Sequence, residues 1–170
     1  MLLDLINFKK LKRVLLYLAV ILVVMALQTL LFSRIRPLGA APMFVPAVVT
    51  AIALFEGSAW GAMLGLVTGV LCALRFSGTT FLFPVLFSLI GFFSGLLAQF
   101  LMNRRLFSYF ALSVAAFVLT AFCQMFRPLF LLDAAPLAVL RTAFLQVFWS
   151  LPFPFLIYFP VRNIGRSSLK

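Results

Sequence analysis

An all-α integral membrane protein, folded as a bundle of about six transmembrane helices, is the fold class that the sequence predicts. The chain has 170 residues, of which 65% are hydrophobic and only 10% are charged, and its mean hydropathy is +1.22. Soluble domains are roughly 45–50% apolar and about 25% charged. Because a span needs about 20 residues, the length accommodates about six spans with short connections and no separate soluble domain.

The chain is expected to begin with a basic interfacial segment at 1–13. This segment mixes apolar side chains with four basic residues, Lys9, Lys10, Lys12 and Arg13, a pattern typical of a short helix at the lipid headgroups. The apolar run 14–32 exceeds the core of a signal peptide, which is about 7–15 residues long. It therefore predicts the first span of a transmembrane domain at 14–161, which a basic cytoplasmic tail at 162–170 follows.

The other predicted spans are apolar runs at 40–55, 59–74, 81–102, 106–126 and 139–161. The second is expected to start irregularly at Pro42 and Pro46, because proline lacks a backbone donor.

Three breaks in the apolar pattern predict how the later spans begin and end. Glu56, Gly57 and Ser58 predict a very tight turn between the second and third spans. The segment 127–136 is expected to be the longest loop, since its prolines disfavour continuous helix. Further prolines, of which Pro152 is the first, predict that the last span is broken.

The distribution of basic residues predicts the orientation in the membrane. With a cytoplasmic amino terminus, nine basic residues lie on that side: Lys9, Lys10, Lys12, Arg13, Arg104, Arg105, Arg162, Arg166 and Lys170. Five lie on the other side: Arg34, Arg36, Arg75, Arg127 and Arg141. The positive-inside rule then predicts the inner, cytoplasmic membrane with both termini cytoplasmic. The same reasoning assigns the net charge of +11 to orientation and membrane lipids, and excludes nucleic acid as a partner.

Glycines at a spacing of four are the clearest local pattern. They are Gly57, Gly61, Gly65 and Gly69, and the next predicted helix repeats the device with Gly91 and Gly95. Residues four apart share a helix face, and glycine lets a neighbouring backbone approach closely in a membrane. We expect this face to pack against another helix of the chain or against a partner protein.

The residues that carry catalytic chemistry are scarce. The chain has no histidine, and Cys72 and Cys123 stand apart in different apolar runs, which excludes the usual histidine triads and zinc sites. The three carboxylates, Asp4, Glu56 and Asp133, fall in a tail and two loops, so paired acid–base chemistry is not expected. A serine or lysine nucleophile stays open. We predict no catalytic, metal or cofactor site.

Polar groups inside the predicted spans are threonines and glutamines only, and no ionisable residue is expected at mid-membrane. Proton- and ion-coupled transporters usually carry one there. Arg127, Asp133 and Arg141 are expected to surround the longest outer loop, where they would contact a partner or lipid headgroups.

Several short motifs occur in a characteristic order: Leu27-Gln28, Pro42 to Pro46, Leu54-Phe55-Glu56-Gly57, the glycines at 61, 65 and 69, Gly91-Phe92-Phe93-Ser94-Gly95, Arg104-Arg105 and Ser150-Leu151-Pro152. This order resembles the family of rod shape-determining MreD proteins over almost the whole chain. The resemblance rests on glycine and proline spacings rather than on catalytic residues.

The resemblance implies a six-helix bundle similar to the substrate-binding component of energy-coupling factor transporters. It implies a non-catalytic scaffold, without transport, in the complex that elongates rod-shaped bacteria by peptidoglycan synthesis. The implied partner is a bitopic, MreC-like membrane protein, and a RodA-type glycosyltransferase and a class B penicillin-binding protein are further implied partners.

The alternative function is a vitamin-binding component of such a transporter. These components commonly carry an Ala-x-x-x-Ala pattern on the first helix, whereas Ala19 and Ala26 are seven residues apart here.

The predicted topology can be tested by labelling single cysteines at Ser77 and Ser168, in a background that lacks Cys72 and Cys123. We expect a membrane-impermeant maleimide to label position 77 from outside intact cells and position 168 only after permeabilisation, because nine of the fourteen basic residues favour cytoplasmic termini. Labelling of position 168 from outside would contradict the topology.

Overall fold

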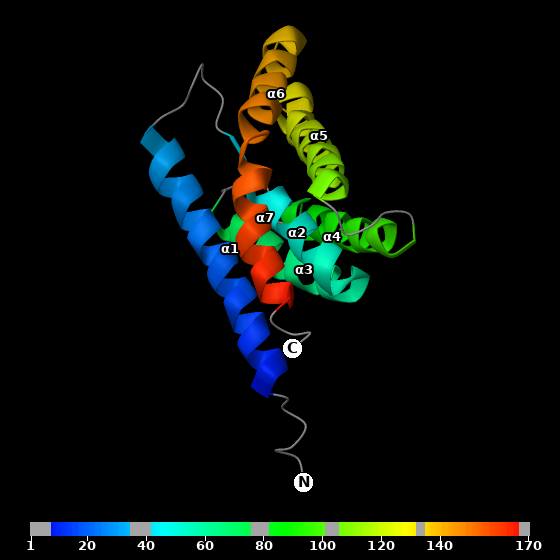
Figure 1. Cartoon of the computed structure of the whole chain (residues 1–170). Coiled ribbons are helices and arrows are strands. Elements are labelled where there is room, and N and C mark those ends of the chain that lie inside the picture. The colour runs from blue at the N-terminus through cyan, green and yellow to red at the C-terminus, as the bar shows by residue number, and fades with distance from the viewer. Residues whose placement is uncertain (1–7, 35–41, 76–81, 101–105, 132–134, 167–170) are drawn as a thin grey trace.

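The computed structural model describes residues 8–34, 42–75, 82–100, 106–131 and 135–166. This part of the chain is helical and contains no strand, which confirms the all-α class (Figure 1). The helices are α1 (Phe8–Arg34), α2 (Val45–Glu56), α3 (Ser58–Arg75), α4 (Leu82–Phe100), α5 (Leu106–Leu131), α6 (Pro136–Ser150) and α7 (Phe153–Arg166).

Three of these helices, α1, α4 and α5, are long and apolar enough to cross a membrane. The pair α6 and α7, bent by 47° at their junction, gives a fourth candidate span. The 12 residues of α2 reach only about 18 Å, against a hydrocarbon thickness of about 30 Å. The structure therefore confirms an apolar, membrane-type helical protein, with three or four candidate spans by length and composition among the described residues.

Helix α1 begins at Phe8, six residues before the start that the apolar run predicts. Between Phe8 and Val14 the residues are mainly lysine, leucine and arginine, all good helix formers. The basic residues are therefore part of α1. At the other end of the chain, α7 extends to Arg166, beyond the predicted boundary at 161. The expected tail thus starts within a helix, and 167–170 lie outside the described residues.

The loop expected at 127–136 is mostly helix. Helix α5 continues through Arg127 and Pro128 to Leu131, and α6 begins at Pro136. Proline inside a membrane helix is tolerated where neighbouring groups satisfy the freed backbone, and proline at the first helical position costs no hydrogen bond. The expectation of a loop at Arg127 was therefore wrong, and the connection is short.

The other three expectations about breaks and irregular starts are confirmed. Helix α2 starts only at Val45, with Pro46 in its first turn, and the last predicted span is divided between α6 and α7 at 151–152. The turn between α2 and α3 consists of Gly57 alone, whose φ of 94° favours glycine. Its N–H donates to the carbonyl of Ala53 at 3.0 Å.

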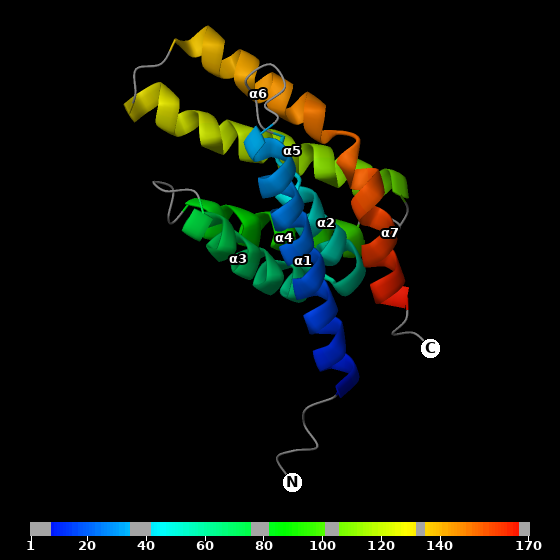
Figure 2. The ribbon, with the colours of Figure 1, turned by 90° about the vertical axis from the view of Figure 1, so that its left-hand side faces the viewer.

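Helix α2 is the centre of the fold. Ten of its twelve residues are buried, and it packs against α1, α3, α4, α5 and α7. Figures 1 and 2 show α3 and α4 side by side next to it, while α1 and α7 cross at a steep angle to this pair. A helix that is apolar on all faces is buried either in a protein core or in a membrane, and α2 is buried by its neighbours in the protein.

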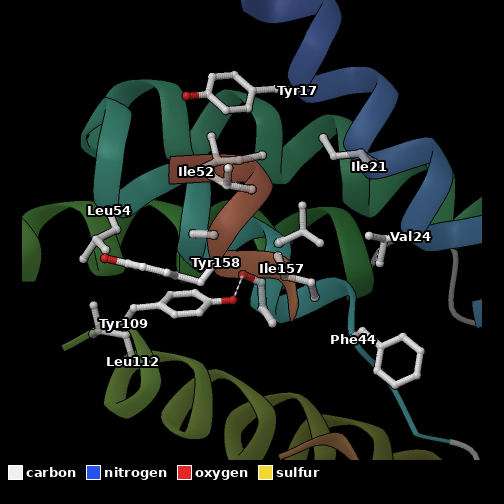
Figure 3. Close-up of a cluster of buried hydrophobic side chains, with 14 of the residues drawn as sticks. Tyr17, Ile21, Val24, Phe44, Ile52, Leu54, Tyr109, Leu112, Ile157 and Tyr158 are labelled. Atoms are coloured by element: carbon white, nitrogen blue, oxygen red, sulfur yellow. Dashed lines mark hydrogen bonds between the residues drawn. The ribbon is translucent and has the colours of Figure 1, made fainter. Parts of the chain in front are cut away.

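The largest buried cluster joins α2 to α1, α5 and α7 (Figure 3). On α1 it uses Tyr17, Ile21 and Val24, which are spaced by four and three and so share one face. The ring centroids of Tyr109 on α5 and Tyr158 on α7 lie 5.4 Å apart. The Tyr109 hydroxyl donates to the carbonyl of Ala47 on α2 at 3.1 Å, so the buried phenol is satisfied.

The glycine face packs inside the chain, against α4 and α2. A Cβ on Gly61 would lie 2.6 Å from the Gly91 carbonyl oxygen and 2.6 Å from the Ala53 Cβ. A Cβ on Gly65 would meet the Phe87 carbonyl group. These backbones approach so closely that only hydrogen fits between them, which gives van der Waals contact that lipid would not supply.

The remaining predicted glycines extend this seam to both ends of α3 and α4. A Cβ on Gly69 would meet the backbone of Pro84 at the start of α4, and one on Gly95 would meet the backbone of Ser58. A Cβ on Gly57 would lie 2.5 Å from the Gln99 amide nitrogen. We call this contact the α3–α4 glycine seam.

We expect Gly65→Leu to destabilise the protein, because its side chain would enter the backbone of α4 at Phe87. Overpacking typically costs about 1–3 kcal/mol, which lowers the melting temperature in detergent by several degrees. The control is Ala59→Leu, at an exposed position of the same helix. Equal melting temperatures for the two variants would show that the seam is not tightly packed.

Candidate functional site

An ion pair joins the amino-terminal part of α1 to the end of α2. Arg13 Nη1 donates to Glu56 Oε1 at 3.1 Å and to Oε2 at 2.9 Å, and the Tyr17 hydroxyl donates to Glu56 Oε1 at 2.8 Å. The Arg13 side chain is 26% exposed and that of Glu56 12%. This is a partly buried, charge-assisted contact, which is stronger than a neutral hydrogen bond.

The groups around Glu56 stabilise its negative charge. Its carboxylate lies at the carboxyl end of α2, where the helix dipole disfavours negative charge, so the guanidinium of Arg13 compensates. A cavity of about 50 Å³ adjoins the pair, lined in part by Trp60. Because Arg13 and Tyr17 both donate to the carboxylate of Glu56, the arrangement links α1 to the end of α2.

Three glutamines and one serine form a second polar network around the residues that precede α2. Gln28 Oε1 accepts from the Phe44 N–H at 3.2 Å, and Ser150 Oγ accepts from the Met43 N–H at 3.0 Å. These bonds satisfy backbone donors ahead of the first turn of α2. The side chains that make them come from α1 and α6, so the network connects elements far apart in the sequence.

The same network continues between α5 and α6. Gln146 Nε2 donates to Gln124 Oε1 at 3.0 Å, and Gln124 Nε2 lies 2.9 Å from the Met43 sulfur. Beside this amide pair is a groove of about 300 Å³, which we call the α5–α6 groove. Its walls are Ala121, Gln124, Met125, Ala138, Val139, Thr142, Ala143 and Gln146.

A larger groove, whose lining side chains are all apolar, lies between α1 and α3. It has a volume of about 690 Å³ and is lined by Leu22, Met25, Ala26, Leu71 and Leu74. We call it the α1–α3 groove. Helix α1 packs against α2 and α7, and only 11% of its span is buried, compared with 44% for α4. The side of α1 that faces α3 is therefore open to lipid or to another helix.

The structure describes the other predicted contact residues only in part. Arg127 belongs to α5, Arg141 is exposed on α6, and Asp133 lies outside the described residues. Within the described ranges no three histidine, cysteine, aspartate or glutamate side chains come together to hold a metal ion. Cys72 on α3 and Cys123 on α5 are both free thiols.

Sequence reasoning missed both polar contacts, although the predicted topology contained a signal for them. It places Arg13 and Glu56 on the same side of the membrane, and it places Gln28 and Gln124 together near the other side. Knowing the side of the membrane does not identify a contact, however, because several helix ends lie on each side. Only the packing around α2 decides which of these ends are neighbours.

No family model, curated protein or solved structure matches this chain. Its function is therefore argued from the grooves and polar contacts described above, together with the order of motifs in the sequence.

We expect Glu56→Ala to lower the free energy of unfolding by about 1.5–3 kcal/mol, the range for hydrogen bonds to charged groups, because Arg13 and Tyr17 lose their shared acceptor. The control is Lys12→Ala at an exposed position, with an effect within about 0.5 kcal/mol. Denaturation in detergent measures both. A double-mutant cycle with Arg13→Ala should give a coupling of at least about 0.5 kcal/mol, and strictly additive losses would contradict the ion pair.

Proposed function

We propose that this protein is a non-catalytic membrane scaffold that binds a single-span, MreC-like partner in a cell-elongation complex. The observation that carries the proposal is the α1–α3 groove, which apolar side chains line beside the largely exposed span of α1. The order of glycine and proline motifs along the sequence supports the choice of partner. In this role a RodA-type glycosyltransferase and a class B penicillin-binding protein would join the same assembly.

The chemistry of the α1–α3 groove suits a transmembrane helix. The side chains of all five lining residues are apolar, which suits contact with the apolar side chains of a transmembrane helix. The small side chain of Ala26 leaves space between Leu22 and the leucines of α3. Helices associate in membranes through close van der Waals packing at small residues, and this groove offers such a site on the outside of the bundle.

The proposal includes a six-span arrangement in the inner membrane with both termini cytoplasmic. Helix α3, with 18 residues, reaches about 27 Å, close to the hydrocarbon thickness of about 30 Å. For α2, the non-helical residues 42–44 add to the reach of its 12 helical residues. The Arg13–Glu56 pair supports this arrangement, because it requires the start of α1 and the end of α2 to be at one depth.

The test is capture of a tagged, single-span MreC-like protein co-expressed with this chain, compared between the wild type and Ala26→Trp. We expect Ala26→Trp to reduce the captured partner at least tenfold, which corresponds to about 1.4 kcal/mol, because the indole fills the α1–α3 groove. Cells that depend on this chain should lose their rod shape in parallel.

The matched control is Leu27→Trp. Leu27 is 46% exposed at the same depth of α1, but it does not line the groove, so capture should be unchanged. Equal capture by Ala26→Trp and the wild type would contradict the groove as the docking site. Failure of the wild type to capture the partner would contradict the scaffold function itself.

A further inference from the structure

We propose that the α5–α6 groove binds a ligand in which a neutral hydrogen-bonding group is attached to an apolar body. The groove is separate from the α1–α3 groove in its residues and in its chemistry. Ligand binding in the α5–α6 groove does not depend on the proposed scaffold function, and the scaffold function does not depend on ligand binding.

The shape of the groove comes from small side chains on both helices. Ala121 on α5 faces Ala138 and Ala143 on α6, so the two helices pack together while a volume of about 300 Å³ stays unfilled. A cavity of about 150 Å³ is large enough to bind benzene. The α5–α6 groove therefore has room for a ring, or for the glycerol backbone of a lipid with the first part of an acyl chain.

The exposure of α6 shows that this hairpin is not simply part of the core. Only Ala143 and Ser150 are buried among its 15 residues, and its main packing partner is α5. Figures 1 and 2 show α6 and the second half of α5 extending away from α3 and α4. A ligand can reach the groove without opening the bundle.

Gln146 gives the groove its polarity. Its Nε2 donates to Gln124, and Gln124 is in turn held by Met43, so the orientation of the amide pair is fixed. No donor in the described part of the chain bonds to Gln146 Oε1, although the residue is half-buried in the wall of the groove. A half-buried carbonyl oxygen gains from a partner, so the ligand should offer a hydroxyl or an N–H at this point.

The eight described lining residues carry no charge, which favours a neutral ligand. A phosphate or carboxylate placed against the alanines would lose its hydration without gaining a cation, which is costly. We therefore expect the bound group to be neutral. Gln124 lies two residues before the end of the candidate span Leu106–Phe126, so the groove is at the depth of the membrane interface, where neutral hydroxyls of lipids and small solutes from water both occur.

These observations leave two sources for the same chemistry: the glycerol hydroxyl of a neutral lipid, or a small water-borne amide. Dioleoylglycerol and nicotinamide are suitable probes for the two sources. Dioleoylphosphatidic acid is the comparator, because it has the acyl chains of dioleoylglycerol and a phosphate in place of the hydroxyl. The full-length protein in phosphatidylcholine nanodiscs is titrated with each, and dissociation constants are obtained from intrinsic tryptophan fluorescence.

We expect dioleoylglycerol or nicotinamide to bind saturably, and the one that binds identifies the source. Gln146→Leu should weaken that binding about tenfold, the factor that one hydrogen bond of about 1.4 kcal/mol supplies. Ala138→Phe, a substitution at an exposed wall position, should abolish it by filling the groove. The matched control Leu140→Phe, on an exposed part of α6 outside the groove, should bind like the wild type.

Three results would overturn the proposal. The first is that neither neutral probe binds the wild type. The second is that Gln146→Leu and Ala138→Phe, checked for wild-type helicity by circular dichroism, both bind as the wild type does. The third is that dioleoylphosphatidic acid binds more tightly than dioleoylglycerol, since the groove would then select for negative charge.

Discussion

The burial of α2 is the constraint on which the rest of the structure depends. Ten of its twelve residues are inside the protein, so neighbours must cover every face of a helix too short to cross the hydrocarbon alone. In a membrane, apolar surface by itself does not drive helices together, and close contact at small residues is needed. The α3–α4 glycine seam follows from this requirement, because α3 and α4 reach α2 together only if their own backbones nearly touch at Gly61 and Gly91.

Polar contacts at the two ends of α1 determine how this helix is attached. The row of Tyr17, Ile21 and Val24 packs on the core, while Arg13 binds Glu56 near one end and Gln28 accepts from the Phe44 N–H near the other. In surroundings of low dielectric, such bonds hold more firmly than they do in water. Helix α1 is thus fixed along one narrow face, and the rest of its surface remains open to form the α1–α3 groove.

The two grooves differ in chemistry in a way that separates their proposed roles. The side chains that line the α1–α3 groove are all apolar, and one of its walls is the largely exposed helix α1, which suits the side of another helix. The α5–α6 groove contains a fixed glutamine pair among alanines, which suits a small neutral group. Because they lie on different pairs of helices, each can be altered without disturbing the other.

The sequence by itself determined the membrane-type all-α fold, the tight turn around Gly57 and the break in the last span, because composition, a glycine at a turn and proline act locally. It misjudged 127–136, since whether Pro128 ends a helix depends on its neighbours. The pairing of Arg13 with Glu56 and the placement of Gln146 beside Gln124 were decided only by the tertiary structure. These partners lie 43 and 22 residues apart, and no local pattern specifies which distant helices the packing around α2 brings together.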